Sequence, residues 1–283
     1  MTELKFPQLS EKFLAWVKAH QEPRTWEWYG NYLNMFCAYP GIAETDAYSL
    51  KPYQVQEWID SHGEKWGNNY RGGAVVAVKR VFNWAEEMGY GEGNPVKKLK
   101  KAPPEPRKIY MKPDEYQEVL SKINYSDSFR ELFIFVWMTG CRPQEVRHIE
   151  ARHVDLDRLR IVFPTKESKG KRKERVIHLE GESAEIIKRL YEKYPEGKLF
   201  RNSRGDAWTK YSICNRFYRI GKIMGKRVIC YGVRHGFGTR KLIQKHDHLT
   251  VAELMGHTDG SMLSKVYSHI GEDDKHLKDA LRD

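Results

Sequence analysis

Three short motifs near the carboxyl end of this chain decide its fold: YGVRHGFGTR at 231–240, LMGH at 254–257 and SKVYSH at 264–269. Apolar residues in the first motif recur at helical spacing, so we expect a helix with Arg234 on its first turns. The second motif predicts a helix that ends at its glycine and leaves His257 in an exposed turn. The third motif places Tyr267 on a short helix.

An earlier motif, TGCRPQEV at 139–146, predicts a stiff corner between two helices. Gly140 can take the left-handed conformation that ends a helix. Pro143 suits the first position of the next helix, which makes Arg142 its N-cap and Glu145 its third residue. The Glu145 carboxylate can then accept a hydrogen bond from the N-cap amide, as in half of a capping box. An arginine therefore projects from a rigid corner, beside a helix N-terminus that favours anions.

Together the motifs supply two arginines, a histidine and a tyrosine, which are the groups needed to hold a phosphodiester and attack it. Guanidinium groups stay charged and pair with phosphate oxygens. A tyrosine can form a covalent ester with the phosphate. Because such an ester resembles the bond broken, we expect no cofactor and no metal. The sequence has neither a GxxxxGK[ST] loop nor an acidic cluster typical of a two-metal nuclease.

The charge of the chain points to the same kind of partner. Its 283 residues include 49 Lys and Arg against 38 Asp and Glu, a formal net charge of +11. Residues 1–100 hold 12 basic and 12 acidic residues, so the whole positive excess lies after residue 100. Such an excess predicts a polyanionic partner, and we expect double-stranded DNA.

Other function classes are disfavoured. No apolar run approaches the roughly 18 residues of a membrane span, and the first residues do not resemble a secretory signal. The 4 cysteines show neither a CxxC pair nor zinc-site spacing. We therefore predict a cytoplasmic protein with reduced thiols and no membrane partner.

The first hundred residues predict helices, at Ser10–His20, from Pro23 to the turn at Pro40, from Lys51 to His62, and at Asn69–Met88. The pair Gly72-Gly73 falls near the start of the fourth helix. Glycine in a helix costs about 1 kcal/mol. We favour a helix that begins after the pair; a close approach of the backbone to another group is the alternative.

Residues 96–108, VKKLKKAPPEPRK, combine five lysines, an arginine and three prolines. This composition predicts an extended, positively charged segment, and we place the domain boundary there. The expected parts are a helical DNA-binding domain at 1–96, a basic Pro-rich linker at 97–109 and a catalytic domain at 110–283. The linker is either a solvated tether or, as we favour, a strap along a phosphate backbone. Candidate DNA contacts are Lys97, Lys98, Lys100, Lys101, Arg107 and Lys108, with Arg71 and Lys171 outside the linker.

After the linker the chain predicts helices at Lys112–Ile123 and Ser128–Met138. RLRIVFPT at 158–165 and ERVIHL at 174–179 are rich in β-formers, and the polar SKGKRK lies between them. This pattern predicts a β-hairpin, which we expect to extend a small sheet. The chain is helical again from Glu180.

The order and spacing of these motifs resemble the tyrosine recombinase (phage integrase) family, whose catalytic domain plan is shared with type IB topoisomerases. The resemblance covers essentially the whole chain. It implies a mainly α protein with a small β-sheet: an N-terminal helical core-binding domain of the SAM-like type and an α+β catalytic domain. It also implies a site-specific recombinase or integrase that works through a 3′-phosphotyrosine and forms a homo-tetramer on DNA.

The resemblance assigns roles to individual residues. Arg142 and Arg234 correspond to two arginines that clamp the scissile phosphate. His257 corresponds to a histidine that hydrogen-bonds the same group, and Tyr267 to the nucleophile. Glu145 corresponds to an acidic residue that buttresses the first arginine.

The catalytic lysine of the family should lie in the hairpin, where several lysines are candidates. Lys169 fits the spacing before the second strand best. Lys166, at the end of the first strand, is the alternative, and Lys171 and Lys173 are further lysines of the turn. Such an ammonium group can protonate the leaving 5′-oxygen.

One position departs from the family pattern. Tyr231 stands where the family most often has histidine, and a phenol with a pKa near 10 is a poor base at neutral pH. We therefore expect Tyr231 to orient the phosphate rather than to transfer protons. His235, next to the second arginine, is expected to be structural.

Two other functions compete with the recombinase. A type IB topoisomerase would relax supercoils as a monomer, but the separate N-terminal helical domain and the linker favour the recombinase. A non-catalytic DNA-binding relative is suggested only by Tyr231. The presence of both arginines, the histidine and the late tyrosine argues against it.

Overall fold

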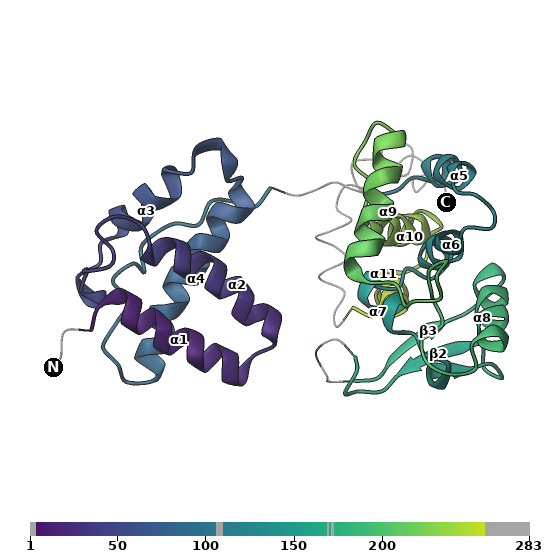
Figure 1. Ribbon diagram of the computed structural model, residues 1–283, viewed down its shortest axis with the longest axis horizontal. Helices are drawn as coiled ribbons and strands as arrows, with labels where there is room; N and C mark the ends of the chain where they lie inside the picture. The colour runs from purple at the N-terminus through teal and green to yellow at the C-terminus, as the bar shows by residue number, and fades with distance from the viewer. Residues whose placement is uncertain (1–3, 106–109, 169, 171–172, 258–283) are drawn as a thin grey trace. The chain divides into compact units, whose positions relative to one another are not determined.

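The computed structural model describes residues 4–105, 110–168, 170 and 173–257 (Figure 1). The chain divides into two compact units, Met1–Arg107 and Lys108–Asp283, called here the first and second unit. No helix in the described ranges combines the length and the apolarity that crossing a bilayer requires. The mainly helical fold with a small sheet that the sequence predicts is confirmed.

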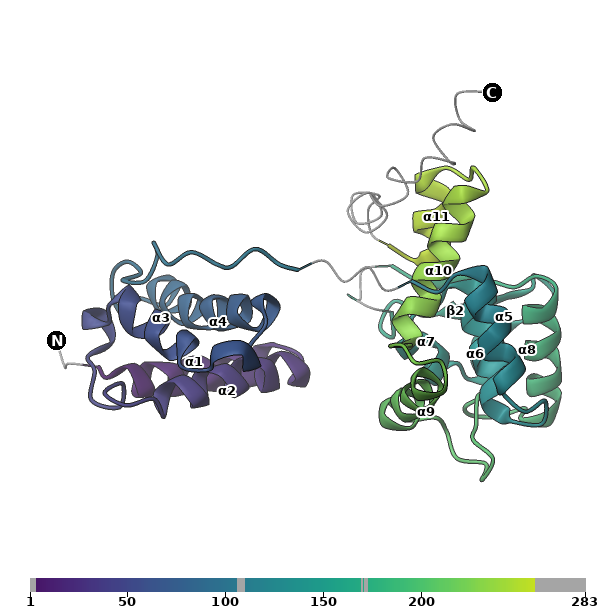
Figure 2. The same cartoon turned by 90° about the horizontal axis from the view of Figure 1, so that it is seen from above.

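The first unit is built from helices packed around an aromatic core. Its α-helices are α1 (Phe6–His20), α2 (Pro23–Cys37), α3 (Pro52–Asp60) and α4 (Asn68–Glu87). A proline in the first turn starts α1, α2 and α3, where a missing amide hydrogen costs nothing. Helices α1, α2 and α4 pack against one another (Figure 2). Phe6, Phe36 and Phe82 are fully buried between them.

The start of α4 corrects the prediction made from its glycines. The helix begins at Asn68, so Gly72 and Gly73 lie inside it rather than before it. A Cβ atom at Gly73 would lie 2.8 Å from Cζ of Tyr32 and would overlap its hydroxyl. The glycine therefore lets α2 approach α4 closely, which is the alternative that the sequence left open.

The basic segment after α4 packs on the first unit where the sequence predicted an extended linker. Val96 and Leu99 are buried in the core of that unit. The Lys79 ammonium group on α4 donates to the Lys97 carbonyl over 2.8 Å. Two buried apolar residues thus hold this stretch in place. Most of its lysines stay exposed: Lys97, Lys98, Lys100 and Lys101.

The second unit consists of helices and a small antiparallel sheet. Its α-helices are α5 (Pro113–Lys122), α6 (Ser128–Thr139), α7 (Pro143–His148), α8 (Glu182–Lys193), α9 (Lys210–Ile223), α10 (Cys230–Ile243) and α11 (His248–Met255). Its described strands are β1 (Val154–Asp155), β2 (Arg160–Phe163) and β3 (Arg175–His178), paired in that order. The predicted hairpin is β2–β3, with Ile161 opposite Ile177. Helix α6 packs between α8 and α10, and α11 packs against both α10 and β3.

Candidate active site

The corner between α6 and α7 has the geometry that the sequence predicts. Gly140 ends α6 with φ +62°, and its amide donates to the Val136 carbonyl. Arg142 is the N-cap of α7, and its amide donates to Glu145 Oε2 over 2.8 Å. The Arg142 guanidinium donates to the other carboxylate oxygen, Oε1, over 2.6 Å. The predicted hydrogen bond from the N-cap amide to Glu145, half of a capping box, is confirmed, and the same carboxylate also orients the arginine side chain.

The second predicted arginine, Arg234, lies inside the protein rather than on its surface. It sits in the second turn of α10 with a relative exposure of 1%. Nη1 donates to the Gly140 carbonyl and Nη2 to the Met255 carbonyl, both over 2.8 Å. Its Nε–H group is buried and has no partner among the described residues. A buried donor without an acceptor is unfavourable, which indicates that a ligand completes it.

His257 follows the end of α11 and lies close to the same groups. Gly256 closes α11 in the left-handed conformation, and the His257 amide donates to the Ala252 carbonyl over 2.8 Å. The side chain is half-buried, so the predicted exposed turn is wrong. Its Nδ1 atom is buried without a partner in the described structure. The turn folds back on α11, and the imidazole lies close enough to Arg234 and Arg142 to feel their charges.

A third arginine, Arg175 on β3, belongs to this site, although none of the sequence motifs pointed to it. Its Nε lies 3.3 Å from Glu145 Oε1, and its Nη2 donates to the Leu254 carbonyl over 2.9 Å. The signal in the sequence was the alternation of β3, in which Arg175 and Ile177 point to the buried face. A charged residue at an inward strand position usually has a specific partner.

The C-terminal end of α11 joins these arginines. Arg175 donates to the carbonyls of residues 253 and 254. Arg234 donates to the Met255 carbonyl, and Arg142 donates to the Gly256 carbonyl. The last carbonyls of a helix have no partner within the helix and carry its negative dipole end. They therefore bring three guanidinium groups from α7, β3 and α10 together. We call Arg142, Arg175 and Arg234 the arginine cluster.

The electrostatics of the cluster favour an anion. Burial lowers the pKa of Arg234 to about 10, and nearby Arg142 adds to this, so Arg234 stays charged at neutral pH. Burial raises the pKa of Glu145, but Arg175 and Arg142 outweigh it and hold that pKa below the usual value. Three guanidiniums and one carboxylate leave an excess of two positive charges. Burial raises the pKa of the adjacent Cys141 thiol to about 12, so it is no rival nucleophile.

The imidazole of His257 is neutral in the folded protein. Burial and then the charges of Arg234 and Arg142 lower its pKa to about 4, against an ordinary value of 6.5. Between these two values the unfolded chain binds more protons at this residue than the folded chain does. The free energy of unfolding therefore rises with pH over that range and falls on acidification.

We expect His257→Gln to reduce this acid-side loss of stability. Glutamine keeps a polar group but does not titrate, so the slope of stability against pH between about 4 and 6.5 becomes shallower. Urea unfolding at several pH values measures the slope. His153 also has a pKa lowered by burial and remains in both proteins, so the difference between them isolates His257. Equal slopes would contradict a buried neutral imidazole.

Several predicted residues lie outside the described residues: Arg107, Lys108, Lys169, Lys171 and Tyr267. The alternative lysine, Lys166, is exposed in the turn that follows β2. Lys173, before β3, pairs with Glu253 of α11 over 3.0 Å. The hairpin that carries the candidate lysines is thus tied to α11.

The remaining predicted residues divide between the surface and structural roles. Tyr231 is 43% exposed on the first turn of α10, with its ring centroid 5.1 Å from that of His235. Arg71, a candidate DNA contact, donates to the Trp66 and Gly63 carbonyls and to Asp60. Its guanidinium therefore holds the loop between α3 and α4.

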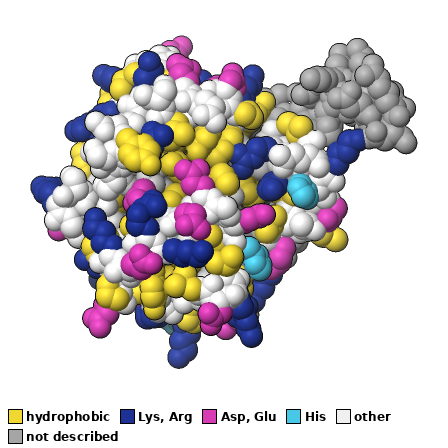
Figure 3. Space-filling view, turned by 90° about the vertical axis from the view of Figure 1, so that its right-hand side faces the viewer, with side chains coloured by type: hydrophobic (Ala, Val, Ile, Leu, Met, Phe, Trp, Pro, Cys, Tyr) yellow, Lys and Arg dark blue, Asp and Glu magenta, His cyan; other side chains and the backbone are white. Residues whose placement is uncertain are grey.

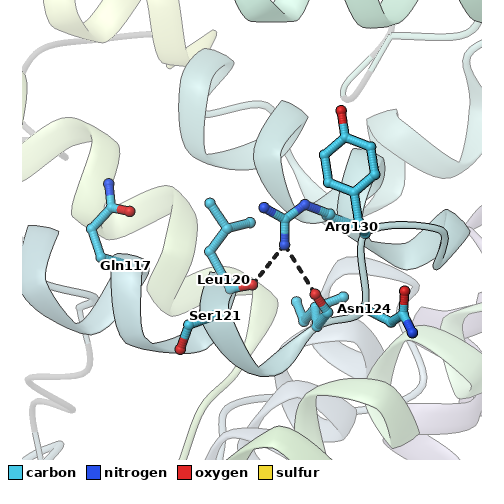
Figure 4. Close-up of a pocket in the computed structure, with 7 residues that line it drawn as sticks. Gln117, Leu120, Ser121, Asn124 and Arg130 are labelled. Atoms are coloured by element: carbon cyan, nitrogen blue, oxygen red, sulfur yellow. Dashed lines mark hydrogen bonds between the residues drawn. The ribbon is translucent and has the colours of Figure 1, made fainter.

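Another hollow of the second unit lies apart from the arginine cluster. A cavity of about 460 Å³ is formed by the end of α5 and the start of α6 (Figure 4). There Arg130 donates to the Leu120 and Ile123 carbonyls, over 2.6 and 3.0 Å, and so caps α5. Figure 3 shows the side of the second unit near α5 and α8, where acidic and basic side chains alternate. Neither feature offers the concentrated positive charge found at the arginine cluster.

Comparison with known proteins identifies the relatives of this chain. A sequence profile described as the phage integrase family matches residues 110–273, which is more than half of the chain. Tyrosine recombinase XerC of Oceanobacillus iheyensis is 27% identical over 227 residues, covering 73% of this chain and 71% of that protein. A tyrosine recombinase of Thermosipho africanus is 24% identical and covers 96% of this chain and 97% of its own length.

Solved structures share the fold at low sequence identity. The Tn1549 transposon integrase, in complex with a circular intermediate DNA, superposes with a TM-score of 0.80 at 16% identity, over 99% of both chains. A lambda integrase dimer bound to a COC′ core site gives a TM-score of 0.78 at 13% identity, over 92% of this chain and 94% of that one. At these identities the likeness shows the fold alone.

Proposed function

Because this chain belongs to the phage integrase family, we propose that it is a site-specific tyrosine recombinase that cleaves and rejoins double-stranded DNA through Tyr267. One observation carries the assignment of the site. Arg142 and Arg234 meet at adjacent carbonyls of one helix end, next to two buried polar atoms, Arg234 Nε and His257 Nδ1, that lack partners in the described structure. A phosphodiester oxygen is the acceptor that this arrangement needs.

The donors that remain on each arginine support this role. A guanidinium has five N–H donors. Arg142 and Arg234 each give two of them to described protein acceptors, which leaves donors for a ligand. Attack on a phosphodiester adds a negative charge to the one it already carries. The excess of two positive charges at the site matches that transition state better than the ground state, which is the condition for catalysis.

The proposed covalent step uses the roles that the family gives to its late tyrosine and its hairpin lysine, both carried over to this chain from the sequence motifs. The Tyr267 oxygen forms a bond to phosphorus while the bond from phosphorus to the 5′-oxygen breaks, and the phenolic proton passes to solvent water. A hairpin lysine, Lys169 or the alternative Lys166, gives a proton to the leaving 5′-oxygen. The 3′-phosphotyrosine conserves the bond energy, so a second DNA 5′-hydroxyl reverses the step and rejoins the strand. His257, neutral at pH 7, supplies a hydrogen bond to the phosphate without adding charge.

The partner of the enzyme is DNA, and strand exchange between two duplexes calls for a homo-tetramer assembled on it. Relatives in the comparison were solved in complex with DNA, in one case as a dimer. The exposed lysines at 97, 98, 100 and 101, fixed by buried Val96 and Leu99, form a basic strap suited to a phosphate backbone.

The experiment that tests the proposal works even when the target sequence is unknown. A library of nicked DNA duplexes, from which the released fragment diffuses away, traps any covalent intermediate. We expect protein–DNA adducts linked through a 3′-phosphate and enriched in one sequence. The absence of an adduct from the whole library, with protein that binds DNA, would contradict the proposal.

We expect the basic strap to determine much of the salt dependence of DNA binding. Replacing Lys97, Lys98, Lys100 and Lys101 with alanine should weaken binding and flatten the plot of log affinity against log salt concentration. The slope changes by about 0.9 for each phosphate that the variant no longer neutralises. Fluorescence anisotropy between low and moderate salt measures it. Alanine at Lys188 and Lys193 of α8, where charges of both signs alternate, is the control, and the strap has no such role if both variants give the same slope.

A further inference from the structure

Arg175 differs from the other members of the arginine cluster in having almost no donor left. Nε lies 3.3 Å from Glu145 Oε1. Nη1 donates to the carbonyls of Val176 over 2.5 Å and Glu253 over 3.4 Å, and Nη2 donates to Leu254 over 2.9 Å. Four of the five donors of this guanidinium are therefore used by the protein. With a single donor left, Arg175 cannot form the paired contact with a phosphate that a clamp requires.

The contacts of Arg175 fix the end of α11 instead. Glu253 and Leu254 belong to the last turn of that helix, and His257 follows the Gly256 turn. A Cβ atom at Gly256 would lie 2.8 Å from Cζ of Arg175, so the turn rests directly on the guanidinium. Any shift of the Arg175 side chain would displace the turn that presents the imidazole.

Strand β3 also contacts the part of the site that holds Arg142. Arg175 pairs with Glu145, which in turn orients Arg142. Lys173, two residues before it, pairs with the Glu253 carboxylate at the surface of α11. That exposed pair contributes little energy, whereas the buried contacts of Arg175 hold fixed geometry. The link between β3 and α11 therefore depends on Arg175.

We propose that Arg175 is a positioning residue, which holds the C-terminal end of α11 against β3 and thereby places His257 at the scissile phosphate. It touches neither the substrate nor the reacting atoms. This inference rests on the proposed function, since it concerns the same phosphate site. A displacement of about 1 Å at a catalytic group can reduce a rate on the order of 10²-fold.

The test compares Arg175→Met and Arg175→Lys with wild type in single-turnover cleavage of a nicked duplex at saturating protein. Methionine fills the space without donors, and lysine keeps the charge but cannot span three carbonyls. We expect a loss of cleavage rate on the order of 10²-fold for methionine and about tenfold for lysine, with DNA affinity unchanged. Arg160→Met on the neighbouring strand β2, whose arginine pairs with Asp155, is the matched control and should cleave normally.

A second arm shows whether Arg175 acts through His257. If it does, Arg175→Met added to His257→Ala lowers the rate by about tenfold or less instead of about 10²-fold, because the main group it positions is already gone and only its contact with Glu145 remains to be lost. Should Arg175→Met fail to fold in thermal melts, Arg175→Lys carries the same comparison. A full, multiplicative loss in the His257→Ala background overturns the inference, as does wild-type cleavage by the arginine variants. If wild type itself forms no adduct, the proposed function fails instead.

Discussion

Replacing Tyr267 with phenylalanine is expected to eliminate the covalent protein–DNA product, because the substitution removes the oxygen that we propose bonds to phosphorus. DNA binding should persist, since the arginine cluster and the basic strap are unchanged. The measurement uses the nicked duplex, denaturing gel electrophoresis and a parallel binding assay. Phenylalanine has no atom that can form the ester, so the loss should reach the detection limit rather than a fixed factor.

Tyr231→Phe is the matched control for this result. Its hydroxyl is on the partly exposed first turn of α10, one helical turn from Arg234 and beside His235. Removing an orienting hydrogen bond weakens cleavage but leaves the nucleophile in place. An adduct that survives Tyr267→Phe, or one that disappears in Tyr231→Phe alone, would show that the nucleophile has been assigned to the wrong tyrosine.

Arg234→Lys is expected to lower the rate of cleavage by about 10²–10³-fold, as removal of one preorganised donor does in comparable sites. A lysine keeps a positive charge. Its single ammonium group cannot serve the Gly140 carbonyl, the Met255 carbonyl and a phosphate at once. Burial would also lower the pKa of that ammonium group and so weaken its charge. Single-turnover cleavage at saturating protein measures the effect separately from binding.

Arg240→Lys on the same helix is the control for Arg234→Lys. Arg240 lies over the Trp137 ring, 4.2 Å from its centroid, and donates to the Trp137 carbonyl. Both contacts are with one residue of α6, and neither involves the carbonyls that bind Arg234. Replacing Arg240 should therefore affect stability more than cleavage. Near-normal cleavage by Arg234→Lys, with normal folding, would remove Arg234 from the phosphate site.

Local rules were sufficient to predict the α6–α7 corner. The order Gly140, Arg142, Pro143 and Glu145 specifies a helix end, an N-cap, a helix start and a carboxylate that accepts from the N-cap amide, all within six residues. The β2–β3 hairpin followed in the same way from its alternating strands. Features set by neighbours in sequence are readable because propensity and turn chemistry act over short distances.

Features set by distant neighbours were missed or misjudged. The Gly72-Gly73 pair is inside α4 because Tyr32 packs against it, and nothing near the pair reveals that partner. Arg175 looked like one basic residue among many in the hairpin, and only the fold brings it to Glu145 and α11. Leu99 has lysines on both sides, so the sequence around it shows no apolar periodicity, although the residue is buried. In each case a tertiary contact overrode the local pattern.

The helix end at α11 has a consequence for the enzyme before it meets DNA. Three like charges repel one another. A pocket that held them without compensating negative charge would widen or would bind anions from solution. Successive backbone oxygens at the end of α11 accept hydrogen bonds from the three guanidinium groups and supply partial negative charge in place of an anion. The arginine side chains are therefore held in place by the protein itself. We therefore expect these three guanidinium groups to rearrange little when DNA binds.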